Sequence, residues 1–201
     1  MSAVRDIYGR LCLIQFEDFG NHNAFKFLKK YRNKYCMFND DIQGTAACAV
    51  SGLIAAEKIT KQSTSEQKFL FLGAGEAGMG IAGLLQQLLR DEGVPASQID
   101  QRINFFDADG LICQERLETG ELGPDHVKFA HDMPHTKDFA EAVRIVKPSA
   151  IIGVAGAGPL FTQEVLEEMA ALNERPIVFA LSNPTSKAEC TAEQAYKYTN
   201  G

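Results

Sequence analysis

A glycine-rich turn near the middle of the chain has the residue types that hold a diphosphate. The apolar run Lys68–Leu72 predicts a strand, and it leads into the GxGxxG pattern Gly73-Ala74-Gly75-Glu76-Ala77-Gly78, which opens a helix of small residues. Gly73 permits the tight turn, Gly75 lets the backbone approach a pyrophosphate, and Gly78 lets the helix pack close to the strand. Unpaired N–H groups at the start of the helix favour the negative charge. We predict dinucleotide binding here, with a purely structural glycine turn as the alternative, because GxGxxG alone is a weak signal.

The next predicted strand ends in an acidic residue. Ile103–Phe106 runs into Asp107, whose carboxylate would lie where a ribose diol binds. Its spacing from Gly78 exceeds the usual ~20 residues, and the polar connection 91–102 accounts for the excess. Asp107 is therefore our candidate for the ribose contact.

Two pairs of acidic residues each follow a short apolar run of strand type. They are Glu17-Asp18 and Asp40-Asp41. Carboxylates on neighbouring strand ends repel one another unless a cation neutralises them, and all-oxygen ligation suits Mg²⁺ or Mn²⁺. We predict Glu17, Asp18 and Asp41 as metal ligands. Taken alone, Asp41 would be a helix N-cap and the first pair an exposed turn.

Strands and helices alternate along the chain and must position these residues. Strands are predicted at 11–16, 35–38, 68–72, 103–106, 150–154 and 177–181, and helices at 21–34, 45–59, after 76, at 139–146, at 162–172 and from about 191. Residues 108–133 show no convincing period, so we expect them to be irregular. The alternation predicts an α/β fold, a Rossmann-type doubly wound parallel sheet with helices on both faces. Ligands of such a sheet bind beyond the carboxyl ends of its strands, where the residues singled out above should converge.

Two more turns follow strands late in the chain. Val154 ends a strand, and a second glycine-rich turn with Gly156 and Gly158 comes after it. Asn183 lies in a Ser-Asn-Pro-Thr turn after the last strand. Its amide is a candidate for a substrate carboxylate or a cofactor carboxamide, although a simple Asn-Pro turn is the alternative.

The composition limits the class of protein. The 201 residues are 45% hydrophobic, which is ordinary for a soluble fold with a sizeable core. The net charge of −6 argues against binding to nucleic acid or to an anionic membrane. Five scattered cysteines without a CxxC pair suggest neither a disulfide framework nor a zinc cluster, so we expect reduced thiols in an intracellular protein. The four histidines are assigned no role, and no signal peptide or membrane-spanning run is found.

Several segments closely resemble malic enzymes, the oxidative decarboxylases of malate. They are Leu13–Ala24, Phe38–Ala46, Phe71–Gly78, Ile152–Gly158 and Phe179–Thr185. The resemblance covers essentially the whole chain and is far more specific than GxGxxG. It implies a metal-ligand-bearing lead-in at 1–60 and a Rossmann-type dinucleotide-binding domain at 61–201.

The resemblance also implies an activity, the oxidation of L-malate to pyruvate and CO₂ with reduction of NAD(P). It implies that Glu17, Asp18 and Asp41 hold Mn²⁺ or Mg²⁺ and that Asn183 contacts malate. Our candidate cofactor residues are Gly73, Ala74, Gly75, Glu76, Ala77, Gly78, Asp107, Val154 and Gly156. The family's general-acid tyrosine and general-base lysine match no position here, so we expect a fragment whose own activity is open. Homo-oligomers, and a place in the cytoplasm or the mitochondrial matrix, are further expectations.

The choice of cofactor and two other functions complete the expectations. NADP-dependent malic enzymes resemble one another in a serine directly after the strand-end acid and a lysine further on. Here Ala108 and Asp109 follow Asp107, and the loop 115–125 is acidic, so we favour NAD over NADP. The competing interpretations are another NAD-dependent dehydrogenase of the same fold and a non-catalytic dinucleotide-binding module.

Overall fold

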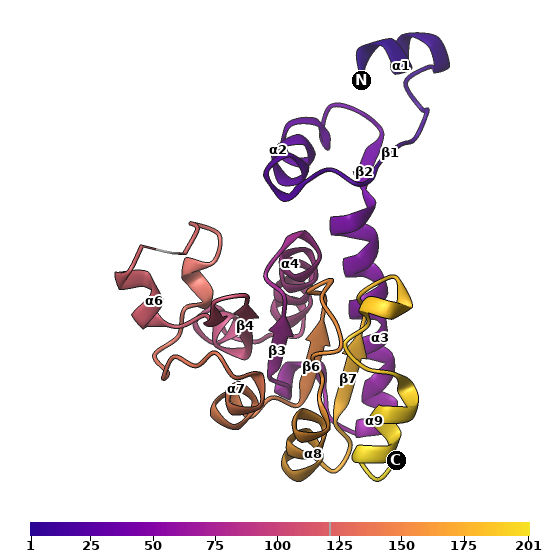
Figure 1. The fold of residues 1–201 in the computed structure, drawn as a ribbon. Coiled ribbons are helices and arrows are strands. Elements are labelled where there is room, and N and C mark those ends of the chain that lie inside the picture. The colour runs from indigo at the N-terminus through magenta and orange to yellow at the C-terminus, as the bar shows by residue number, and fades with distance from the viewer. Residues whose placement is uncertain (121) are drawn as a thin grey trace.

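The fold is built on a five-stranded sheet in the order β5-β4-β3-β6-β7 (Figure 1). The computed structural model describes residues 1–120 and 122–201, with the backbone alone described at 21 and 22. The strands are β3 (Phe69–Leu72), β4 (Ile103–Asp107), β5 (Gly110–Leu111), β6 (Ala150–Gly153) and β7 (Ile177–Ala180). All neighbours pair in parallel except β4 and β5. The chain enters at β3, adds β4 on one side and then β6 on the other, so the winding direction reverses between β3 and β6.

Helices cover both faces of this sheet, because side chains of its inner strands alternate between two apolar cores. Phe69 and Phe71 pack with α3 (Thr45–Thr60) and α4 (Glu76–Asp91) on one face. Leu70 and Leu72 pack with α7 (Phe139–Val146) and α8 (Gln163–Leu172) on the other. The last helix is α9 (Ala192–Tyr198). The predicted doubly wound α/β fold is therefore confirmed, and strands buried on both faces explain why their sequences read as continuous apolar runs.

The two strands that precede the acid pairs do not join this sheet. β1 (Ile14–Phe16) and β2 (Met37–Asn39) pair in parallel as a separate two-stranded sheet, packed with α2 (Asn21–Tyr31) around a small core of their own. The expectation that all the site residues lie beyond strands of one sheet is wrong for this reason. A π-helical turn, η1 (Asp40–Gly44), connects β2 to α3 and rests on α4, where a Cβ on Gly80 would lie 2.5 Å from the carbonyl oxygen of Ile42. This close approach brings the acids to the glycine-rich turn.

The segment predicted to be irregular has short regular elements. It contains β5, α6 (Gln114–Glu118), the 3₁₀ turn η4 (Val127–Phe129) and a bridge between Cys113 and His131. These elements are too short to show a period, and burial of Phe129 and Arg116 fixes them instead. The remaining short elements are α1 (Ser2–Tyr8), η2 (Thr64–Glu66), α5 (Ala96–Ile99), η3 (Asp100–Arg102) and η5 (Thr185–Lys187). None of the helices in the described part of the chain is both long and apolar enough to cross a bilayer.

Candidate functional site

The glycine-rich turn sits at the point where the winding direction reverses, and its glycines are required by close contacts. Gly73 has φ of +112°, and a Cβ there would lie 2.8 Å from the carbonyl carbon of Val154 at the end of β6. A Cβ on Gly78 would lie 2.4 Å from the carbonyl oxygen of Gly73. The turn is thus pressed between the neighbouring strand end and its own helix. Its N–H groups at the start of α4 face a region where an anion would bind.

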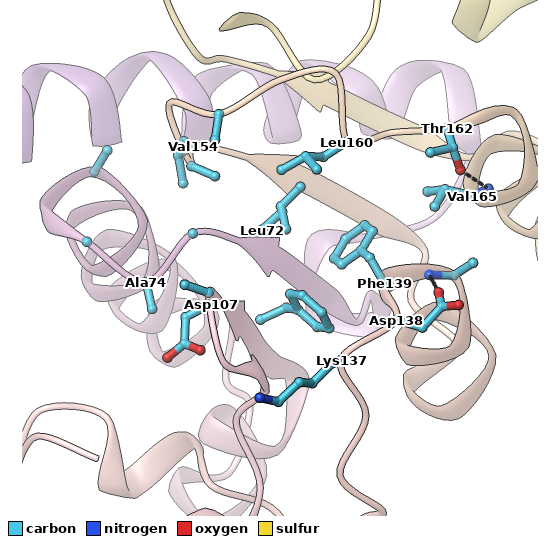
Figure 2. Close-up of a pocket in the computed structure, with 18 of the residues that line it drawn as sticks. Leu72, Ala74, Asp107, Lys137, Asp138, Phe139, Val154, Leu160, Thr162 and Val165 are labelled. Carbon is cyan, nitrogen blue, oxygen red and sulfur yellow. Dashed lines mark hydrogen bonds between the residues drawn. The ribbon is translucent and has the colours of Figure 1, made fainter. Parts of the chain in front are cut away.

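A cavity of about 940 Å³ opens at this turn (Figure 2). Residues Gly73–Ala77 line it, together with Asp107 from the end of β4 and Val154 from the end of β6. Figure 2 shows Asp107 and Lys137 on the side opposite Val154 and Leu160. The volume of this cavity lies within the usual range of pockets for small molecules and cofactors. We call it the turn cavity.

Asp107 forms a bidentate ion pair with Arg116, a residue that no sequence pattern singles out. The Arg116 guanidinium donates to both carboxylate oxygens, with Nη1 2.9 Å from Oδ1 and Nη2 3.1 Å from Oδ2, and the Asp109 N–H donates to Oδ1 at 2.8 Å. Arg116 is 4% exposed and also donates to the carbonyl of Gly110. The negative charge of Asp107 is therefore offset at the lip of the turn cavity. The sequence carried no signal for this pair, because Arg116 lies in the segment that showed no period.

A second cavity of about 440 Å³ adjoins the first, and we call it the acid cavity. Its lining includes Asp18, Asp41, Gly156 and Asn183, so the structure brings together two predicted metal ligands, a predicted cofactor residue and the predicted substrate residue. The two cavities have three lining residues in common, which are Glu76, Ala77 and Val154. The two cavities therefore lie against the same three residues.

The two aspartates of the acid cavity are linked to each other. The Asp18 N–H donates to Oδ2 of Asp41 at 2.9 Å, and Asp18 has a left-handed φ of +57°. The N-cap that was the alternative role for Asp41 is filled by Asn39, whose side chain accepts from the N–H of Ile42 at 2.9 Å. Asp41 is thus not needed as a cap, and its carboxylate lines the cavity.

Glu17 is not brought to the acid cavity. Its carboxylate accepts a hydrogen bond from the side chain of Gln15, and it does not line the cavity. In the described part of the chain, no three side chains of His, Cys, Asp or Glu are grouped so as to hold a metal ion. Mg²⁺ commonly keeps several waters and takes only one or two carboxylates, and Asp18 with Asp41 fit that manner of binding.

Glu76 adds to the negative charge between the two cavities. Burial raises the pKa of its carboxyl group above 4.5, and the nearby carboxylate of Asp41 raises it further. Two acids whose charges disfavour each other at the edge of a cavity are typical of functional sites.

Two further residues of the site gave no signal in the sequence. His126, from the loop before η4, has Nε2 2.9 Å from the carbonyl oxygen of Ala74 and so steadies the glycine-rich turn. Glu189 is fully buried and contacts the loops that carry Gly156 and Asn183. His126 contacts Ala74 across 52 residues of sequence and Glu189 contacts Ala155 across 34, which is beyond the reach of a local pattern.

Comparison with known proteins agrees with the geometry. The family model described as malic enzyme, NAD binding domain, matches residues 42–201, and the one described as malic enzyme, N-terminal domain, matches residues 1–32. The chain is 56% identical over its whole length to the mitochondrial NADP-dependent malic enzyme of Homo sapiens and 55% identical to the NADP-dependent malic enzyme of Columba livia. It spans 33% and 36% of those proteins, about a third of their length.

Solved structures give the same result for the fold. The NAD-dependent malic enzyme of Thermotoga maritima is 26% identical, with a TM-score of 0.76 over 98% of this chain and 48% of that one. The malic enzyme of Entamoeba histolytica is similar in fold at 24% identity, with a TM-score of 0.75 over 98% of this chain and 39% of that one.

Proposed function

The chain belongs to the malic enzyme family, and on this premise we propose that it forms the NAD(P)- and metal-binding part of an enzyme that converts L-malate to pyruvate and CO₂. One observation carries the proposal: the turn cavity and the acid cavity adjoin at Glu76, Ala77 and Val154. Hydride transfer needs the nicotinamide ring against the carbon that bears the malate hydroxyl. Two cavities that meet at the end of β6 supply that arrangement.

In this proposal each element of the site has a task. The N–H groups of residues 74–78 bind the cofactor diphosphate, since the N–H of Gly73 donates to the carbonyl oxygen of Phe106 at 2.8 Å. Asn183 orients the malate carboxylate or the nicotinamide carboxamide. Asp18 and Asp41 hold Mg²⁺ or Mn²⁺ in the acid cavity, and Glu17, which does not line that cavity, would have to turn toward it to serve as a third ligand. When bound, the dinucleotide accepts the hydride and the metal ion serves as the Lewis acid for the decarboxylation. We assign proton transfer to no residue of this chain.

The choice between NAD and NADP rests on the far end of the turn cavity. Asp109 would repel a 2′-phosphate, which favours NAD, but Arg116 offsets the charge of Asp107 and also lies 4.0 Å from the Asp109 carboxylate. Lys137 is the basic side chain among the described residues lining this cavity. The relatives from Homo sapiens and Columba livia are NADP-dependent by name, whereas the structural neighbour from Thermotoga maritima is NAD-dependent by name. We therefore propose an NAD(P) site in which Lys137 decides the preference. If NADP is preferred, Lys137→Ala should weaken NADP⁺ binding by about tenfold and leave NAD⁺ binding within twofold.

The proposed metal site is tested by separating metal binding from cofactor binding. Mn²⁺ binding is followed by electron paramagnetic resonance, and cofactor binding by the fluorescence of NADH and NADPH. Asp41→Ala should abolish Mn²⁺ binding and spare both cofactors. Asp40→Ala, one residue away but outside the lining of the acid cavity, is the matched control and should keep Mn²⁺ binding. Equal loss of Mn²⁺ and cofactor binding in Asp41→Ala would make Asp41 structural.

Turnover separates the competing functions. Production of NADH or NADPH from L-malate, in the presence of Mn²⁺, measures the proposed activity directly. A chain that binds NADH tightly but never oxidises malate, even with the remaining segments of the family supplied, would be a non-catalytic module. Turnover that does not depend on Mn²⁺ would favour another dehydrogenase of the same fold. We further propose a homo-oligomer located in the cytoplasm or the mitochondrial matrix, with light scattering as the check on assembly.

A further inference from the structure

We propose that Glu189 is a positioning residue that sets how the nicotinamide half of the cofactor lies against the substrate. This inference rests on the proposed function. Glu189 belongs to neither cavity lining and is 0% exposed, but it contacts Ala155 of the turn cavity and Ser182 of the acid cavity. Its carboxylate contacts both the loop after β6 and the loop after β7.

The carboxylate connects these loops through three hydrogen-bond donors. Oε1 accepts from the N–H of Ala155 at 3.3 Å and from the hydroxyl of Ser182, and Oε2 accepts from the N–H of Ser182 at 3.3 Å. The Ser182 hydroxyl oxygen in turn accepts from the N–H of Gly156 at 2.9 Å. A relay therefore runs from Gly156 through Ser182 to Glu189. It ties a predicted cofactor residue to the residue next to Asn183.

The backbone around Glu189 holds its carboxylate in a fixed position between the two loops. Its carbonyl oxygen accepts from the N–H groups of Leu160 and Phe161 at 3.1 and 3.0 Å. A Cβ on Gly153 would lie 2.3 Å from Cδ of Glu189, and a Cβ on Gly158 would lie 2.3 Å from the carbonyl oxygen of Ala188. The two glycines are therefore required for residues 187–189 to pack against β6 and the loop after it, and the side chain of Glu189 lies directly against Gly153.

The chemistry of the contact suits a charged carboxylate. All three partners donate hydrogen bonds, and an ionised carboxylate is an acceptor at both oxygens. Burying a charged group is costly unless it is hydrogen-bonded, so an apolar side chain would fill this space at lower cost if filling were the only task. What the carboxylate adds is a fixed distance between the loop after β6 and the loop after β7.

The consequence for binding differs between the two halves of the cofactor. The adenosine diphosphate half would contact residues 73–77 and Asp107, which Glu189 does not touch. The nicotinamide half would lie where Val154 and Gly156 meet Asn183. Loss of the hydrogen bonds between Glu189 and the two loops should therefore weaken NADH binding and leave ADP binding unchanged. A loss of folding would weaken both probes equally.

The test compares NADH with ADP in two variants. Glu189→Gln is nearly isosteric, but the NH₂ group of its amide would face a hydrogen-bond donor, either of Ala155 or of Ser182, and that hydrogen bond would be lost. Ser182→Ala removes the hydroxyl of the relay and keeps the carboxylate, so it decides the question if Glu189→Gln does not fold. We expect each variant to weaken NADH binding by about tenfold and to keep ADP binding within twofold. Glu193→Gln, an exposed glutamate in the first turn of α9, is the matched control and should change neither.

The outcomes separate this inference from the proposed function. Circular dichroism first establishes that each variant is folded at the temperature of the titration. Equal weakening of NADH and ADP, or no change in either probe in folded variants, would overturn the positioning role of Glu189. An unaltered chain that binds neither NADH nor ADP would instead overturn the proposed function.

Discussion

The close packing of α4 on the glycine-rich turn can be tested at two glycines of that helix, where alanine should change the stability in opposite directions. Gly78 and Gly83 both lie inside α4, five residues apart. A Cβ on Gly78 would lie 2.4 Å from the carbonyl oxygen of Gly73, which is backbone and cannot rotate away. A Cβ on Gly83 would meet nothing within 4 Å, and Gly83 is exposed. Alanine at the two positions thus differs chiefly in the contact with the turn, since the nearest atom outside the turn to a Cβ on Gly78 is a ring carbon of Phe105 at 3.4 Å.

The magnitudes follow from two opposing effects. Alanine in place of glycine inside a helix stabilises by roughly 0.5–1 kcal/mol, and both variants gain this. Gly78→Ala must also push the start of α4 away from the turn, and overpacking of this kind costs about 1–3 kcal/mol. We expect Gly83→Ala to be more stable than the unaltered chain and Gly78→Ala to be less stable. The gap between the two variants should equal the overpacking cost.

Urea unfolding and cofactor binding are the assays. With a dependence of about 2 kcal/mol per M of urea, the two midpoints should differ by roughly 0.5–1.5 M. Gly78→Ala should also weaken NADH binding, because the N–H groups of the turn move with the helix start, and Gly83→Ala should not. If Gly78→Ala is as stable as Gly83→Ala and binds NADH equally well, α4 does not pack on the turn in the way described and the reasoning fails.

Two further predictions concern titrating groups. Burial and then the Asp41 carboxylate raise the pKa of Glu76, so the folded chain binds more protons than the unfolded chain and its stability falls as pH rises through that pKa. In metal-free buffer, Glu76→Gln should therefore gain stability over the unaltered chain above that pKa but not below 4.5, in urea midpoints measured against pH; a constant difference at every pH would contradict this. Burial and then Glu189 raise the pKa of the Cys190 thiol, whereas Cys36 and Cys48 are exposed. A thiol reagent at neutral pH should modify Cys36 and Cys48 first and Cys190 only in urea, and early labelling of Cys190, located by mass spectrometry, would contradict its burial.

Much of the fold could be predicted from the sequence because the signals are local. Helices predicted at 45–59 and 139–146 are observed at Thr45–Thr60 and Phe139–Val146. The apolar runs of β3 and β6 are buried on both faces and therefore lack alternation, which is typical of inner parallel strands. Periodicity and turn residues act within a few positions, so these elements can be found without their partners. The short elements between 108 and 133 could not be predicted from the sequence, because only the burial of their side chains in the folded chain defines them.

The residue types of the site can be recognised without a structure: the turn 73–78, Asp107, Asn183 and the two acid pairs. Which of these residues meet depends on the tertiary fold. It put the acid pairs after the two strands of a separate sheet, joined Asp18 to Asp41 and left Glu17 outside the cavity. It also supplied Glu189 from 34 residues beyond Ala155. The physical reason is that a turn is specified by the conformational freedom of its own residues, whereas a hydrogen bond between distant loops exists only once the sheet between them has formed.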